Sequence, residues 1–371
     1  GLYLVEITLN FVFPIAGNRA RASAAEAAGV EFDTRTKSHV YRNLKSEGVD
    51  AVPSVNPSTF IGTNGVEHLY PFGGVSGKTT VNCNESGKYT IFPSDRYGFN
   101  NPDSEWDSSQ TEWVLTGDSF IHGACVNPGE DIAGQIRSIS GETVINLGNS
   151  GNGPLIELAV LKEYAESRKQ KTVLWVYYEG NDLQNLTGEK STPLLMSYLQ
   201  PEFSQNLIHR QTEIDNRLGK YIEAEPLFRT IKMLRLYNIR ERLRFYVLRF
   251  FVNVNVDVEP LFTEILTKAR DRTAAWGGKL YFVYLPEFER YATEVQNHDR
   301  YRKRREVIHV AKSLNLPVID IHHEVFANHP DPLSLFPFRM PGHYTAGGYS
   351  EIAKAIVSGV INEQQRQYSA E

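Results

Sequence analysis

The chain has only two cysteines, Cys83 and Cys125, among its 371 residues. They can form at most one disulfide, so cysteine content alone does not fix the redox compartment. The sequence also lacks an excess of basic charge, with 39 Lys and Arg against 44 Asp and Glu and a formal net charge of -5. Proteins dedicated to nucleic acids need a strong basic footprint, so we expect no nucleic-acid partner. No stretch reaches the roughly 18 apolar residues that a membrane-spanning helix needs.

Neither internal repeats nor low-complexity tracts interrupt the chain. A composition of 41% hydrophobic and 22% charged residues is ordinary for a folded globular protein and excludes intrinsic disorder as the main state. A chain of this length can bury a large core without metal or disulfide cross-links.

The opening segment, residues 1–14, is apolar, is interrupted by Glu6, and does not begin with Met. Two interpretations fit this pattern: a packed strand or helix of the domain, or the stub of a removed membrane anchor. The second places the rest of the protein outside the cytoplasm, in the periplasm or at the cell surface. We therefore expect an extracytoplasmic protein that is close to a membrane in its full-length form.

Residues 1–108 are predicted to form an N-terminal extension with few regular elements. Residues 15–50 have the composition of a polar connector, and residues 52–107 are rich in Gly, Pro, Asn and Ser. Short runs such as residues 88–92 have the composition of strands.

From residue 109 to 371 the pattern changes to alternating strands and helices. Five runs rich in β-branched and aromatic residues are predicted strands: residues 112–116, 143–147, 172–178, 279–285 and 317–321. They lack strict polar alternation, which is typical of strands covered on both faces. Alternating strands and helices predict an α/β fold: a three-layer α/β/α arrangement with a flavodoxin-like parallel sheet. The last helix shows apolar residues at helical spacing, with Thr345 as its expected N-cap.

A helical insertion is predicted at about residues 184–256. It carries a basic run that is opposed only by Glu241: Arg229, Lys232, Arg235, Arg240, Arg242, Arg244 and Arg249. The run fits a packed helix with a solvated basic face, and it also fits a surface for anionic lipid or anionic glycan.

Polar and small residues follow the predicted strands, at the sheet edge where ligands of such folds bind. The first strand ends in Gly-Asp-Ser119-Phe, which presents a serine at a strand-to-helix turn, where it can act as a nucleophile. The second runs into residues 146–154, a Gly- and Asn-rich stretch with backbone N–H groups suited to an oxyanion. The third ends in Glu-Gly-Asn181-Asp, whose amide is a further donor, and His343 precedes the last helix as a candidate base.

This ordered set of motifs resembles the SGNH hydrolase superfamily, the GDSL-type esterases and lipases, over roughly residues 111–362. The resemblance implies that Ser119 is the nucleophile and His343 the general base. It implies that Gly151 and Asn181 complete the oxyanion hole together with the Ser119 backbone N–H.

One position departs from the family pattern. The family usually has an acid three residues before the histidine, where this chain has Met340. Two groups remain as candidates for orienting the imidazole: the Asp331 carboxylate and the backbone carbonyl of Met340.

The resemblance implies an ester hydrolase that acts on O-acyl groups, with O-acetyl groups of an extracytoplasmic carbohydrate as the leading substrate. A polysaccharide O-acyltransferase that uses the same Ser and His is one alternative. A catalytically weak scaffold that binds glycan or membrane is another. We expect no cofactor and no metal, because the neighbouring His322 and His323 lack ligand spacing with other His or Cys residues.

Overall fold

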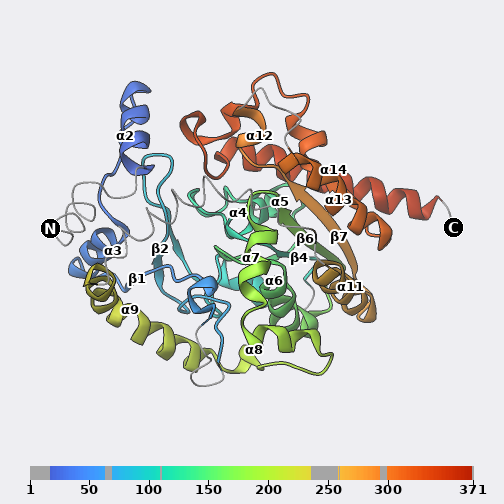
Figure 1. Cartoon of the computed structure of the whole chain (residues 1–371), viewed down its shortest axis with the longest axis horizontal. Helices are drawn as coiled ribbons and strands as arrows, with labels where there is room; N and C mark the ends of the chain where they lie inside the picture. Colours follow the sequence, from blue (N-terminus) through green and yellow to red (C-terminus); the bar gives the residue numbers. More distant parts are fainter. Residues whose placement is uncertain are drawn as a thin grey trace.

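The structure is a computed structural model of the chain (Figure 1). It describes residues 17–62, 69–108, 111–234, 258, 260–292 and 299–369. The basic run of the predicted insertion falls largely beyond residue 234, so it lies outside the described residues.

A five-stranded parallel sheet in the order β5-β4-β6-β7-β8 forms the centre of the molecule. Its strands are β4 (Trp113–Thr116), β5 (Val144–Asn146), β6 (Thr172–Tyr178), β7 (Lys279–Leu285) and β8 (Val318–Asp320). Each coincides with a predicted strand to within a residue at either end. Because all five run in the same direction, their carboxyl ends share one edge of the sheet.

Helices cover both faces of this sheet, which confirms the predicted α/β/α class. Side chains of each strand alternate between the two faces. In β4, for example, Val114 packs into one hydrophobic cluster, whereas Trp113 and Leu115 pack into the other. The described helices of the domain are α4 (Ser119–His122), α5 (Ile132–Ser140), α6 (Pro154–Val160), α7 (Asp182–Glu189), α8 (Pro193–Met196), α9 (Gln211–Leu234), α11 (Pro260–Ala275), α12 (Glu289–Ala292), α13 (Asp299–Ser313) and α14 (Ala346–Tyr368).

The last helix shows how sequence and structure agree locally. The Thr345 side chain caps α14 by accepting a hydrogen bond from the Gly348 N–H. The apolar face of α14, which includes Ile352, Ile356 and Val360, is fully buried against the sheet. This burial fixes the loop that precedes the helix and carries His343.

The residues before 109 form α2 (Gly17–Ala27), α3 (Lys37–Ser46) and a small sheet of β1 (Ala51–Pro53), β2 (Thr79–Val81) and β3 (Ile91–Pro93). In Figure 1 they gather at one side of the molecule, opposite α13 and α14. Phe72, Phe99 and Trp106 belong to the same hydrophobic cluster as Val114 of the large sheet. This part of the chain therefore shares a core with the sheet.

The described part of the predicted insertion contains α7 through α9. None of the helices in the described ranges is both long enough and apolar enough to span a bilayer.

Candidate active site

Ser119 lies in a tight turn between β4 and α4. The carboxylate of Asp118 caps the helix by accepting the Phe120 N–H at 2.9 Å. A side chain at Gly117 would be 2.7 Å from Ile121, so only glycine allows the strand to turn this closely over the helix. The turn leaves Ser119 partly exposed at the carboxyl edge of the sheet.

His343 reaches Ser119 from the loop before α14. Its Nε2 atom is 2.8 Å from Ser119 Oγ, within hydrogen-bond distance. The imidazole packs against the ring of Phe120, which in turn stacks on Tyr178 at a centroid distance of 4.0 Å. These ring contacts fix the orientation of the imidazole relative to the serine.

Glu85 occupies the other side of the imidazole. Its Oε1 atom is 3.2 Å from His343 Nδ1, and its Oε2 accepts the His343 backbone N–H at 2.7 Å. The Nδ1 contact has the distance of an ion pair, although the ring N–H is not well aligned with the oxygen. Both side chains are largely buried, with 19% of His343 and 16% of Glu85 exposed. Ser119, His343 and Glu85 thus form a serine-histidine-acid arrangement.

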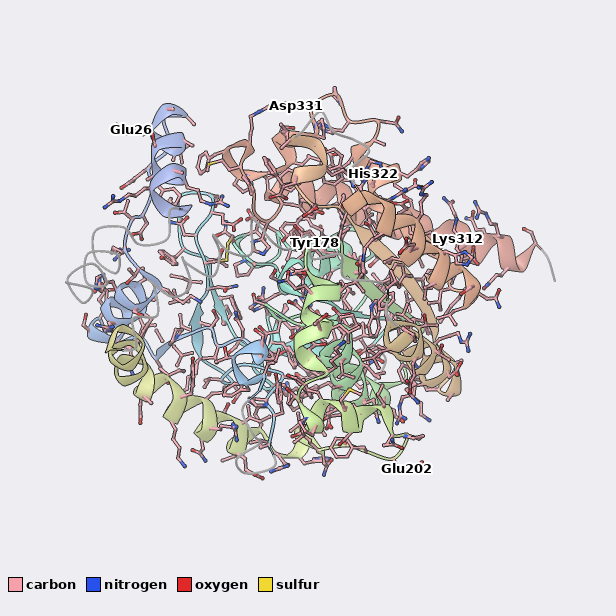
Figure 2. The ribbon with its side chains drawn as sticks, in the orientation of Figure 1. Glu26, Tyr178, Glu202, Lys312, His322 and Asp331 are labelled. Atoms are coloured by element: carbon pink, nitrogen blue, oxygen red, sulfur yellow. A yellow bond between two sulfur atoms is a disulfide. The ribbon has the colours of Figure 1, made fainter. Side chains whose placement is uncertain are left out.

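This arrangement corrects the sequence-based expectation for the orienting group. Asp331 is instead half-exposed and paired with Arg339 at 2.5 Å. Figure 2 shows it at the periphery, whereas Tyr178 lies near the centre of the view. The Met340 carbonyl makes no hydrogen bond to His343 among the contacts of the described residues. Glu85 takes the position beside the imidazole instead. It belongs to the N-terminal part of the chain and lies 258 positions before His343.

Arg21 of α2 holds Glu85 in place. Its guanidinium lies 3.5 Å from Glu85 Oε1 and is itself 9% exposed. It also donates hydrogen bonds to the backbone carbonyls of Glu85 and Pro341. One arginine therefore joins the segment that carries Glu85 to the loop that carries His343.

A disulfide between Cys83 and Cys125 makes a second connection (Figure 2). Cys83 lies two residues before Glu85, and Cys125 lies shortly after α4, which begins at Ser119. The cross-link thereby ties the segment that carries Glu85 to the turn that carries Ser119. It also settles the pairing that the sequence left open.

The three groups that the sequence suggests as oxyanion donors follow β4, β5 and β6. They are the backbone N–H groups of Ser119 and Gly151 and the side-chain amide of Asn181, all in partly exposed residues. Gly151 has a φ of +78°, and a side chain there would be 2.4 Å from Ser58 Oγ. The loop conformation thus requires glycine. The Asn181 side chain lies beside the Asp118 carboxyl, whose pKa is raised by burial and lowered in part by this contact.

Helix α7 makes hydrogen bonds to the loop that carries Gly151, a set of contacts that we call the α7 brace. Asn185, one turn after Asn181, donates to the Asn152 carbonyl at 2.9 Å. Glu189, a further turn along, accepts the backbone N–H groups of Gly153 at 2.6 Å and Leu155 at 2.9 Å. One helix therefore carries Asn181 at its N-terminal end and makes hydrogen bonds to the residues directly after Gly151.

His122 supports the site without facing the serine. Its Nδ1 atom is 3.2 Å from Ser150 Oγ, and its ring is buried against Phe92. Burial, together with the charges of Lys37 and His343, lowers the pKa of His122 to about 3. The ring is therefore neutral at physiological pH.

The electrostatics around His343 favour a proton on its ring. Burial alone would lower the pKa of His343, but the charge and contact of Glu85, with a smaller effect of Asp118, raise it above the ordinary value. Burial would raise the pKa of Glu85, yet His343 and Arg21 hold it below its usual range. The Glu85 carboxylate is thus placed to stabilise a protonated His343.

The site does not provide a complete set of metal ligands. Among the described residues, one group with suitable spacing comprises Glu85, Cys125 and His343. The Cys125 sulfur is bonded to Cys83 and offers no thiolate. The two remaining side chains bind each other, so this group does not fit a metal centre.

No protein-family model matches the chain, and no curated protein matches it in sequence. Solved structures with a similar fold include a lipase/acylhydrolase from Enterococcus faecalis. It is 14% identical, with a TM-score of 0.39, over 68% of this chain and 97% of its own. Axe2, an acetylxylan esterase from Geobacillus stearothermophilus, is 15% identical, with a TM-score of 0.38, over 67% of this chain and 94% of its own. The function of this chain rests on the geometry of its own site.

Sequence reasoning missed Glu85, Arg21 and the α7 brace. One signal for Glu85 was present, because Cys83 lies two residues away and Cys125 lies six residues after Ser119. Pairing these cysteines would have brought the segment containing Glu85 to the nucleophile. Nothing in the local pattern around Arg21 pointed to the site.

Proposed function

We propose that this protein is a serine-dependent ester hydrolase. The observation that carries the proposal is the continuous contact from Ser119 Oγ through His343 to the Glu85 carboxylate. This is the arrangement that activates a serine hydroxyl in unrelated hydrolase folds. Ser119, Gly151 and Asn181 follow three strands at the same edge of the sheet, where we infer that their N–H groups stabilise the oxyanion of an acyl-transfer intermediate.

The reaction follows from these positions. Ser119 Oγ attacks the ester carbonyl carbon while His343 Nε2 takes the hydroxyl proton, and the three donors stabilise the resulting oxyanion. The intermediate collapses, His343 passes the proton to the departing alkoxide, and an acyl-serine remains. Water then attacks the acyl-serine with His343 again as base, which releases the carboxylic acid and restores Ser119.

The substrate class that we infer is an O-acyl ester of a carbohydrate, with O-acetyl as the leading acyl group. We call residues 147–153, the loop that carries Gly151, the oxyanion loop. Polar side chains from the N-terminal part of the chain, such as Ser58, border this loop. Such hydroxyl groups suit a substrate with many hydroxyls of its own.

An extracytoplasmic location is part of the proposal. The disulfide between Cys83 and Cys125 supports it, since disulfides form and persist mainly in oxidising compartments. Fractionation of cells that express the full gene tests it. Recovery of the protein in the cytosol with both cysteines reduced would contradict this location.

A fluorophosphonate probe tests the nucleophile directly. Wild-type protein should form an adduct on Ser119, and Ser119→Ala should abolish both the adduct and turnover of p-nitrophenyl acetate. A matched control is Ser58→Ala, which removes a hydroxyl near the same loop and should retain labelling. An adduct that maps to another serine would refute the assignment.

A panel of p-nitrophenyl esters of increasing chain length, with and without added oligosaccharide, separates hydrolysis from transfer. Hydrolysis predicts free acid as the product in both conditions. Acylated oligosaccharide as the main product would identify an O-acyltransferase that uses the same residues.

A further inference from the structure

A cavity lined by both polar and apolar side chains lies between α3, β1 and α9. It has a volume of about 200 Å³, and its walls include Lys37, Tyr41, Ser54, Asn56, Thr59 and Tyr221. This is smaller than the roughly 300–1,000 Å³ of sites for drug-sized ligands. The cavity suits a group the size of one sugar residue.

Lys37 is the charged group of this cavity. Its Nζ atom donates to Ser54 Oγ at 2.8 Å. Among the described residues that line the cavity, none is acidic. Burial lowers the pKa of Lys37 to about 8, and no carboxylate among the residues that the structure describes opposes this effect. A partly buried ammonium without a counter-ion is unfavourable, and an anion placed beside it would relieve that cost.

The position of Lys37 on its helix is a second feature that is unfavourable for a positive charge. Lys37 is the first residue of α3, directly after the N-cap Thr36. The N-terminal end of a helix carries partial positive charge, which disfavours a cation there. Helix stability therefore does not account for a lysine at this place.

The cavity and the oxyanion loop are separated by a single turn of chain. This turn, η1 (Pro57–Phe60), places Ser58 against Gly151 and places the next residue, Thr59, in the cavity wall. Consecutive Cα atoms are only about 3.8 Å apart. The turn that lines the cavity therefore also borders the loop that carries Gly151.

A smaller cavity also connects the Lys37 cavity to the oxyanion loop. Ser54 lines both cavities, and the smaller one extends to His122, which contacts Ser150. Lys37 contacts Ser54, which lines both cavities.

We propose that this cavity is a subsite for an anionic group, a carboxylate or a phosphate, carried by a sugar of the acylated substrate. Lys37 would pair with the anion, while Ser54, Asn56 and the tyrosines would contact the sugar. This inference rests on the proposed function, and it narrows the substrate class to acidic carbohydrates.

Binding to Ser119→Ala protein tests the subsite without turnover. Titration calorimetry with glucuronate, glucose 6-phosphate, inorganic phosphate and neutral glucose should show binding of the anionic ligands and none of glucose. Tighter binding of glucuronate than of glucose 6-phosphate would identify a carboxylate as the group recognised, and the reverse order would identify a phosphate. Equal binding of glucose and glucuronate would overturn the proposal.

Variants locate the binding. Lys37→Gln in the same background should weaken binding of the preferred anion about tenfold or more, since a hydrogen bond to a charged group is lost. Lys45→Gln, which removes an exposed lysine from the same helix, is the matched control and should bind as before. Asn56→Asp adds a negative charge to the cavity wall and should also weaken binding. Unchanged binding in both cavity variants would refute the assignment.

The outcome is separable from that of the proposed function. Turnover of p-nitrophenyl acetate by the wild-type protein reports on Ser119 and His343 with a neutral substrate. An active esterase that does not bind glucuronate or phosphate would refute the subsite alone. Binding that depends on Lys37, without esterase activity, would refute the hydrolase and leave an anion-binding cavity.

Discussion

Replacing Glu85 by glutamine keeps the size of the side chain and removes its negative charge. In the structure this charge lies 3.2 Å from His343 Nδ1. At an effective dielectric constant near 20, two unit charges at that distance attract by about 5 kcal/mol. That energy corresponds to roughly 10⁴-fold in rate if it is realised fully in the transition state. Residual exposure and the nearby Asp118 reduce it, so we expect kcat to fall by about 10²–10⁴-fold.

The pH dependence gives this prediction a second readout. General-base catalysis needs neutral His343, so kcat/KM rises as the pH passes upward through the pKa of this histidine. Glu85 raises that pKa. In Glu85→Gln the acidic limb should therefore move to lower pH while the plateau falls. A merely structural defect would lower the plateau without moving the limb.

The assay is steady-state hydrolysis of p-nitrophenyl acetate between pH 5 and 9, with folding checked by circular dichroism. Asp331→Asn is the matched control, because that carboxylate pairs with Arg339 at the surface and should be nearly silent. The reasoning would be refuted if Glu85→Gln kept wild-type kcat and Asp331→Asn lost it.

Three further predictions follow from the same site. Asn181→Ala should lower kcat by about 10²–10³-fold with little change in KM, because one oxyanion donor is lost; a change confined to KM in steady-state kinetics would contradict that role. Replacing both Cys83 and Cys125 by serine opens a cross-link between positions 42 apart. It should lower the free energy of unfolding in urea by up to about 4 kcal/mol and lower kcat as Glu85 loosens; wild-type values of both would show that the link is dispensable. Incubation with EDTA should leave ester hydrolysis unchanged, whereas a loss restored by zinc would show that a metal had been overlooked.

The sequence by itself determined the sheet and most of the positions at its edge. The five strands were recognisable because strands covered on both faces need continuous apolar runs, as in residues 172–178 and 279–285. Ser119, Gly151 and Asn181 follow three such strands. Parallel strands bring their carboxyl ends to one edge, so the chain order of these residues was enough to predict that they lie at the same edge of the sheet.

Only the tertiary structure decided which acid faces His343. Asp331 was the nearer candidate in sequence, but Arg339 lies eight positions away and pairs with it locally. Glu85 reaches the imidazole because three long-range contacts converge there: the Cys83–Cys125 disulfide, the Arg21 ion pair and the backbone N–H of His343. Strand periodicity and motif spacing record only local relations along the chain. A partner that is set by packing between distant segments leaves no such pattern.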